Sequence, residues 1–399
     1  MPQHGNKVAL LGAFCLFLST IEYMIPKPLP FMRLGVANLP LMLALDILPT
    51  PSFFLLVAIK IFGQALITGS LFSYVFLFSL SGTVLSSLVM FALHRLFRKN
   101  ISFIGIGTAG AMVSNTVQIA LASMFVFGRG ALLIAPPFLG AGLATGLALG
   151  GFCEYFADKS EWLRKLRVSD GEVLPRGAST RMYTETVVAP VKWFRGSSRD
   201  LFIAGLIMAA ALVFNPSTWG RVVQFLLFWV FATLLGRKNN VLVMSLVIVS
   251  IVFFNLLVPY GQVLGSFGGF RLTKGALLMG IRRAVTVQGL FMLSKVCVSG
   301  DLRIPGRFGS LISESFRIFA FLGQRGEHLK KREAWKNRER IIDRLDALLF
   351  ELGGLCTSAE KAPASRSRPR DIAVLCAAIL LAYLPHSHRL FTYFTRVVL

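Results

Sequence analysis

The sequence predicts an all-α integral membrane protein. Of its 399 residues, 55% are hydrophobic and only 15% are charged. The mean hydropathy of +0.67 is well above that of an ordinary soluble domain. Several stretches of about 17 to 25 residues carry almost no charge, which is the length that a helix needs to cross the hydrocarbon core. Because backbone polar groups must be hydrogen-bonded inside lipid, each stretch is expected to be a helix.

Eleven apolar stretches divide into two groups. Six lie at 7–25, 34–48, 52–69, 71–94, 101–127 and 131–157, and five lie at 201–214, 220–236, 240–258, 275–298 and 371–385. The segment between the groups mixes both charges with Gly, Ser, Thr and Pro, as linkers do. We therefore expect a six-span domain at 1–157, a cytoplasmic linker at 158–199, and a second membrane domain at 200–399.

The net charge of +23 is best explained by membrane topology. With the N-terminus in the cytoplasm, the inner loops would be 94–100, 158–199, 236–240 and 299–370, and all four are basic. The outer loops are nearly uncharged, apart from the first one with Lys27 and Arg33. This pattern favours a multi-pass protein of the inner, cytoplasmic membrane in contact with lipid. It argues against a nucleic-acid partner, although net charge alone would suggest one.

Polar side chains inside the first group of stretches are the candidate binding residues, since they cost free energy in hydrocarbon unless they face a cavity or a partner. Lys60 lies near the middle of its stretch, where an ammonium costs on the order of 3 kcal/mol. Either Glu22 or Asp46 pairs with it, or it contacts an anionic or carbonyl-bearing ligand. The amides could also serve only as hydrogen bonds between helices. We expect a pocket for a small ligand lined by Asn38, Lys60, Gln64, Ser81, Asn115 and Gln118.

Two further patterns concern packing and partners. Gly142, Gly146 and Gly150 recur every four residues on one helix face, which permits close helix packing. In the second half, 328–352 has apolar residues at helical spacing among many charges. It is expected to be an amphipathic cytoplasmic helix that docks a partner or lies on lipid.

Several chemistries lack their sequence signatures. The chain has no GxxxxGK[ST], HExxH, GxSxG or CxxC motif. It is therefore expected to have no ATPase site of its own, not to be an enzyme, and to hold no metal and no cofactor. Its five cysteines have no metal-ligand spacing and are expected to pack as small apolar side chains.

The first domain resembles a known family. The runs "RLGVANLPLMLALDIL", "AIKIFGQALITGSLFS", "FLFSLSGTVLSSLVMFALHRL" and "IGIGTAGAMVSNTVQIALA" are similar to the Gx transporter family, also labelled heptaprenyl diphosphate synthase component I. That family is grouped with the substrate-binding S components of energy-coupling factor (ECF) vitamin transporters. The resemblance covers about 7–157 and implies a six-helix bundle that binds a vitamin-like molecule, a quinone precursor or an isoprenoid. The cationic position, commonly arginine in the family, is Lys60 here.

The second domain more loosely resembles the transmembrane T component of the same transporters. "LTKGALLMGIRRAV" is similar to a segment of that family, and "GQRG" is similar to the Arg-Gly motif of its coupling helices. The resemblance implies a fused S and T component, with coupling helices at about 300–352. Separate ABC-type ATPase subunits would use the ATP and bind at Arg317, Arg325, Gly326 and Arg338.

Three other functions stay open at this point. The family label suggests an accessory or tether subunit of polyprenyl diphosphate synthesis, although no aspartate-rich magnesium cluster occurs. An ion-coupled secondary carrier would work without ATP. A membrane scaffold would transport nothing.

Overall fold

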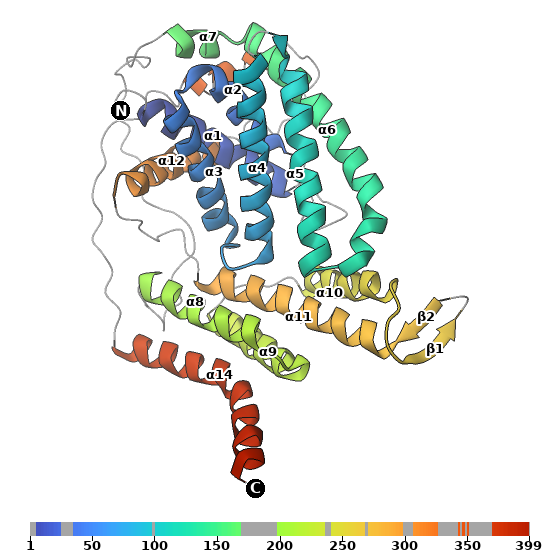
Figure 1. Cartoon of the computed structure of the whole chain (residues 1–399). Helices are drawn as coiled ribbons and strands as arrows, with labels where there is room; N and C mark the ends of the chain where they lie inside the picture. Colours follow the sequence, from blue (N-terminus) through green and yellow to red (C-terminus); the bar gives the residue numbers. More distant parts are fainter. Residues whose placement is uncertain are drawn as a thin grey trace.

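The chain is an all-α membrane protein (Figure 1). The computed structural model describes residues 5–24, 35–97, 100–168, 198–235, 241–267, 270–297, 306–325, 342–343, 345–347, 349–350 and 369–398. Within them, six helices are long and apolar enough to cross a membrane. The only strands in these ranges form one two-stranded hairpin.

The first unit contains the helices α1 to α7. Their bounds are α1 Gly5–Met24, α2 Leu39–Ile47, α3 Thr50–Thr68, α4 Tyr74–Phe97, α5 Phe103–Phe125, α6 Ala131–Lys159 and α7 Glu161–Val168. A single 3₁₀ turn, Val36–Asn38, leads into α2. Prolines occupy the first turns of α2 and α3, where a missing N–H costs nothing. Gly69 ends α3 with φ at 60°, in the left-handed region that favours glycine.

Helices α5 and α6 pack closely because α6 presents glycine at the contact. A Cβ atom at Gly150 would lie 2.5 Å from Ile104 Cα, and one at Gly146 would lie 2.9 Å from Thr108 Cα. At Gly142 it would meet the Asn115 side chain. The glycine spacing in the sequence therefore marks a true contact face, with backbone against backbone.

The second unit follows with α8 Ser198–Phe214, α9 Thr218–Leu234, α10 Val241–Leu256, α11 Lys274–Cys297, α12 Gly306–Arg325 and α14 Pro369–Val398. Strands β1 Val263–Phe267 and β2 Phe270–Thr273 pair antiparallel between α10 and α11. We had expected an uncharged loop there. Alternating apolar residues beside glycines favour a hairpin instead.

Each of the eleven apolar stretches contains a helix, but the helices are not equal. Six are both long and apolar enough to cross a membrane, namely α1, α3, α4, α5, α6 and α11. Helix α2 has only nine residues, about 14 Å at the rise of an α-helix, so it does not cross a bilayer alone. Its expectation as a full span is wrong, because Pro40 and the turn before it shorten the helix.

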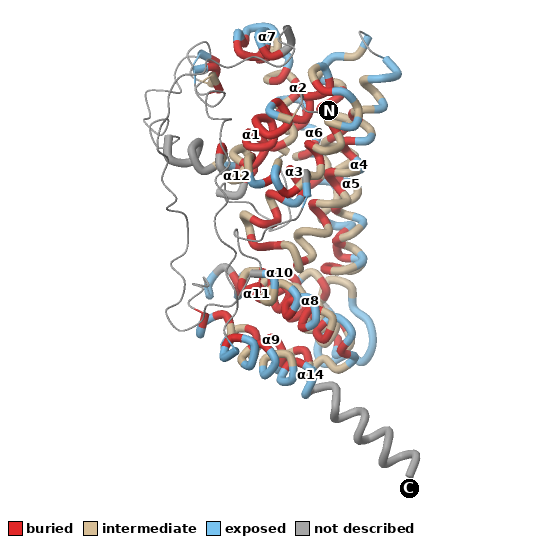
Figure 2. The backbone as a smooth tube through the Cα atoms, turned by 90° about the vertical axis from the view of Figure 1, so that its left-hand side faces the viewer, coloured by how far each residue is buried: buried red, intermediate tan, exposed pale blue. Residues whose placement is uncertain are grey.

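The second unit lies across one end of the first. In both views, α8, α9 and α11 run across the ends of α4 and α5 (Figure 1, Figure 2). The α3–α4 and α5–α6 loops make the junction. Phe72 N donates to Ser294 Oγ of α11 at 3.0 Å, and Asn255 Nδ2 of α10 donates to Val126 O at 2.9 Å.

Two later segments of the chain, α12 and the residues around Asp346, return to the first unit. Ser315 Oγ of α12 donates to Ala9 O of α1 at 3.1 Å. The carboxylate of Asp346 accepts from Ser160 Oγ at 2.5 Å and from the N–H of Glu161 and Trp162 at 2.7 and 3.3 Å. Asp346 thus caps α7 from a distant part of the chain.

Candidate functional site

A small polar cavity lies inside the helical bundle of the first unit. It is enclosed by side chains and backbone from α1, the turn before α2, and α3 to α6. Its volume is about 20 Å³, which is room for roughly one water molecule. The lining residues are Glu22, Gly35, Ala37, Asn38, Lys60, Gln64, Thr83, Ala111, Ser114, Asn115 and Thr145.

Lys60 and Asn38 form the centre of this cavity. Lys60 is 2% exposed, and its Nζ donates to Asn38 Oδ1. Glu22, on the last turns of α1, lines the same cavity and is 6% exposed. A buried ammonium therefore has an amide and a carboxylate within one cavity, which lowers the cost of its burial.

Glu22 also shapes the turn that carries Asn38. Its carboxylate oxygens accept from the N–H of Gly35 at 3.3 Å and of Ala37 at 3.4 Å. Gly35 has φ at 82°, a conformation that glycine adopts at little cost. The turn before α2 is thus held against the end of α1, and this sets the position of Asn38 over Lys60.

Four of the six residues expected at the site line this cavity, namely Asn38, Lys60, Gln64 and Asn115. Asn115 is fully buried, and its Nδ2 donates to Phe138 O at 3.2 Å. Ser81 and Gln118 do not line the cavity. Gln118 lies one turn from Ser114 and donates to its Oγ at 2.9 Å, which supports the cavity wall from behind.

Sequence reasoning left out four polar residues that line the cavity: Glu22, Thr83, Ser114 and Thr145. Glu22 was considered only as a partner for Lys60. Ser114 directly precedes Asn115, so the signal was present. Thr83 and Thr145 gave no such signal, because a threonine hydroxyl in a helix can donate a hydrogen bond to a carbonyl of its own helix. Thr145 Oγ1 donates to Gly142 O in this way.

The arrangement suits a small molecule with both donors and acceptors. One cation, one carboxylate, amides and hydroxyls line this space. At 20 Å³ the space is smaller than a metabolite, so binding one would require the surrounding groups to move apart.

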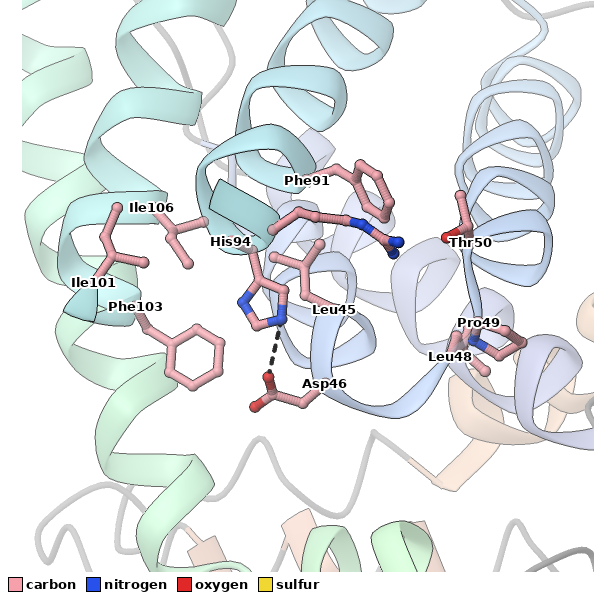
Figure 3. Close-up of a pocket in the computed structure, with 11 residues that line it drawn as sticks. Leu45, Asp46, Leu48, Pro49, Thr50, Phe91, His94, Ile101, Phe103 and Ile106 are labelled. Atoms are coloured by element: carbon pink, nitrogen blue, oxygen red, sulfur yellow. Dashed lines mark ion pairs between the residues drawn. The ribbon is translucent and has the colours of Figure 1, made fainter. Parts of the chain in front are cut away.

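A larger, more open pocket lies at the other end of α2. It has a volume of 690 Å³ and is lined by the ends of α2 and α4 and the start of α5. His94 Nε2 and Asp46 Oδ1 are 3.4 Å apart on its wall, and Phe91 and Phe103 supply apolar surface (Figure 3). Asp46 therefore contacts α4 of its own unit, at a pocket separate from the cavity around Lys60.

The expected ATPase-coupling residues fall at the margin of what the structure describes. Arg317 and Arg325 lie on α12, but the structure does not describe their side chains. Gly326 and Arg338 lie outside the described residues. Most of 328–352 is also outside them. Of its described part, Ile342 and Leu349 are buried in the core cluster that includes Trp162 of α7.

Metal and thiol chemistry gain no support from the described residues. In these ranges no three His, Cys, Asp or Glu side chains gather to hold a metal ion. Cys15, Cys153 and Cys297 are buried in the core, where they pack as small apolar side chains.

Comparison with known families separates the chain into two parts. Residues 11–156 match the family model described as heptaprenyl diphosphate synthase component I. Residues 199–299 match a model described as a domain of unknown function (DUF8519). No curated protein and no solved structure matches the chain. The first unit is thus similar to a Gx-type, S-component-like membrane protein, and the likeness of the second to a T component stays a prediction.

Proposed function

We propose that the chain is a membrane uptake subunit of ECF type, in which the first unit binds a small metabolite and the second couples release to separate ABC-type ATPases. The observation that carries the proposal is the small polar cavity around Lys60, Asn38 and Glu22. It lies within the part of the chain that matches the Gx-type family model. Ionisable side chains at such depth in a membrane bundle are binding-site candidates by default.

The crossing of the two units supports a cycle in which the first unit reorients. Helices α4, α5, α6 and α11 each have the length and apolarity to span a bilayer, and spanning helices tilt by at most about 40° from the membrane normal. Because α11 runs across the ends of the others (Figure 1), the two sets do not both stand upright in this arrangement. Reorienting the first unit would expose its cavity to the other side.

ATP would act from outside the chain, since no phosphate-binding loop occurs in the sequence. Helix α12 and the segment around Asp346 are the proposed route of coupling. Both contact the first unit directly, at Ala9 and at the start of α7. A movement of α12 by a bound ATPase would therefore reach α1, whose last turns carry Glu22.

A second candidate function is favoured by the description of the matching family. The chain could serve as a membrane subunit or tether in polyprenyl diphosphate synthesis. It would then hold a synthase at the membrane, and the cavity around Lys60 would have only a structural role.

The proposed binding role of the cavity is tested by identifying the small molecules that remain bound to the purified protein. The full chain, Lys60→Met and the control Arg129→Met are purified in mild detergent, and bound small molecules are extracted and identified by mass spectrometry. Arg129 is an exposed loop cation, so the control changes charge equally. We expect a near-stoichiometric metabolite in the wild type and the control, and at least a tenfold loss in Lys60→Met. Equal retention by all three, or no retained metabolite in any, contradicts the proposal.

A further inference from the structure

In one stretch of the second unit, every charged side chain is a cation. Residues 201–300 contain eight Lys or Arg and no Asp or Glu. Three of the cations, Arg221, Arg282 and Arg283, lie within the apolar helices α9 and α11. An arginine inside a membrane helix is costly unless it is paired or faces a polar partner, so the compensating charge must come from elsewhere.

The three arginines gather at one place. Arg221 Nη1 donates to Thr286 Oγ1 at 2.7 Å, and Thr286 Oγ1 donates to Arg282 O one turn earlier on α11 at 2.7 Å. Arg221 therefore sits against the face of α11 that carries Arg282, and the two like charges repel each other. Arg283 Nη1 donates to Asn255 Oδ1 at the end of α10, at 3.0 Å.

The first unit contributes residues to the surroundings of the three arginines, but none of the contributing residues is acidic. Tyr74, the first residue of α4, is close enough to both Arg221 and Arg283 to interact electrostatically with them. The Gly128 backbone of the α5–α6 loop lies against the Arg283 guanidinium. The two loops that face the second unit, 69–73 and 126–130, contain no Asp or Glu.

The hydrogen bonds leave most of the donors at this place unused. Arg221 is 8% exposed. Three of its N–H groups donate hydrogen bonds, to Val213 O, Asn215 O and Thr286 Oγ1. Arg283 makes its one bond to Asn255. Arg282 is half-buried, and its guanidinium group makes no hydrogen bond or ion pair with the described part of the chain. Three cations thus share one site with no carboxylate from the described residues.

We propose that Arg282 and Arg283, backed by Arg221, bind the phosphate group of an anionic amphiphile at the junction of the two units. Arginine guanidinium groups bind phosphate oxygens in pairs of hydrogen bonds, and Arg282 and Arg283 have the free donors. Arg221 is in the first turn of α9, and Asn255 is next to the last residue of α10.

The surroundings favour a molecule with an apolar tail over a free ion. Val223 of α9 and Phe253 of α10 are 49% and 51% exposed beside these helix ends. They offer apolar surface next to a cationic site. The bound phosphate would neutralise part of the cluster and join α11 to the start of α4, so its release would free the units to move.

Native mass spectrometry of the detergent-purified full chain tests this site. The chain is incubated with vesicles of phosphatidylglycerol or of phosphatidylcholine, or with inorganic diphosphate. We expect wild-type protein to retain phosphatidylglycerol, and Arg282→Gln to retain at least tenfold less, because a hydrogen bond to a charged group typically changes affinity by about that factor or more. The control Arg271→Gln removes an exposed cation just before α11 and should retain as much as wild type.

The outcomes separate the sources of the phosphate. Retention of phosphatidylglycerol that inorganic diphosphate does not displace supports a lipid, and displacement by diphosphate supports a soluble phosphate ligand at the same site. Arg282→Gln should unfold at the wild-type temperature, since the Arg282 side chain makes no hydrogen bond or ion pair with the described residues. Equal retention by wild type and Arg282→Gln, equal loss in Arg271→Gln, or equal retention of both lipids overturns the proposal.

Discussion

The contact between α5 and α6 gives a sharp prediction at Gly150. In Gly150→Ala the new methyl group would lie 2.5 Å from Ile104 Cα and 2.8 Å from Phe103 O. Both are backbone atoms, so no side chain can turn aside and the two helices must separate locally. Extra methyl groups in a tight contact typically cost about 1–3 kcal/mol.

The neighbouring glycine provides the matched control. A Cβ atom at Gly151 meets nothing within 4 Å, so Gly151→Ala should gain only the better helix propensity of alanine, about 0.5–1 kcal/mol. The same gain offsets part of the clash in Gly150→Ala. The two variants should therefore differ by roughly 1–3 kcal/mol in the free energy of unfolding, with Gly150→Ala the less stable.

Thermal unfolding in detergent, followed by circular dichroism, measures this difference. The wild type and both variants are compared in the same detergent and lipid. A melting temperature for Gly150→Ala equal to or above that of Gly151→Ala would refute the close backbone contact between α5 and α6.

Three further variants test other contacts. Asp346→Asn should weaken the cap of α7 by about 1–2 kcal/mol, seen as faster amide hydrogen exchange in α7, whereas the exposed Asp343→Asn should change nothing; protection unchanged in Asp346→Asn would refute the cap. Asn255→Ala removes the donor to Val126 O and the acceptor of Arg283, so it should lower the unfolding temperature in detergent, and an unchanged temperature would argue against this junction. Arg325→Glu should abolish binding of ATPase subunits while ligand binding persists, and equal loss of both would contradict the coupling role.

The helices of the fold could be predicted from the sequence because lipid leaves the backbone few alternatives. Apolar runs of membrane length marked the stretches that hold α1, α3 to α6 and α11, and spaced glycines marked the α5–α6 contact. The short α2 and the hairpin before α11 could not be predicted, since hydropathy alone does not distinguish a buried half-helix from a span or an exposed hairpin from a loop.

The candidate site could be predicted in part. Lys60, Asn38 and Asn115 stood out because charged and amide groups are rare in apolar helices. Glu22 was harder to place, because its role depends on the turn at Gly35 folding back onto the end of α1. Gln118 is equally polar in sequence, but it donates to Ser114 one turn earlier on its own helix and does not line the cavity itself.

The capping of α7 by Asp346 and the gathering of Arg221 with Arg282 join positions far apart in the chain. Asp346 lies 186 residues from Ser160, and Arg221 lies 65 residues from Thr286. Neither pairing leaves a local pattern, so a single sequence does not reveal it.

The central claim, that this chain is the membrane part of an ATP-driven uptake system, is tested most directly by its partners. The chain is affinity-purified from native cells in mild detergent, and the co-purifying proteins are quantified by mass spectrometry. The account predicts ABC-type ATPase subunits in near-stoichiometric amounts, reduced in Arg325→Glu. A prenyl diphosphate synthase without any ATPase, or no ATPase at all, would contradict it.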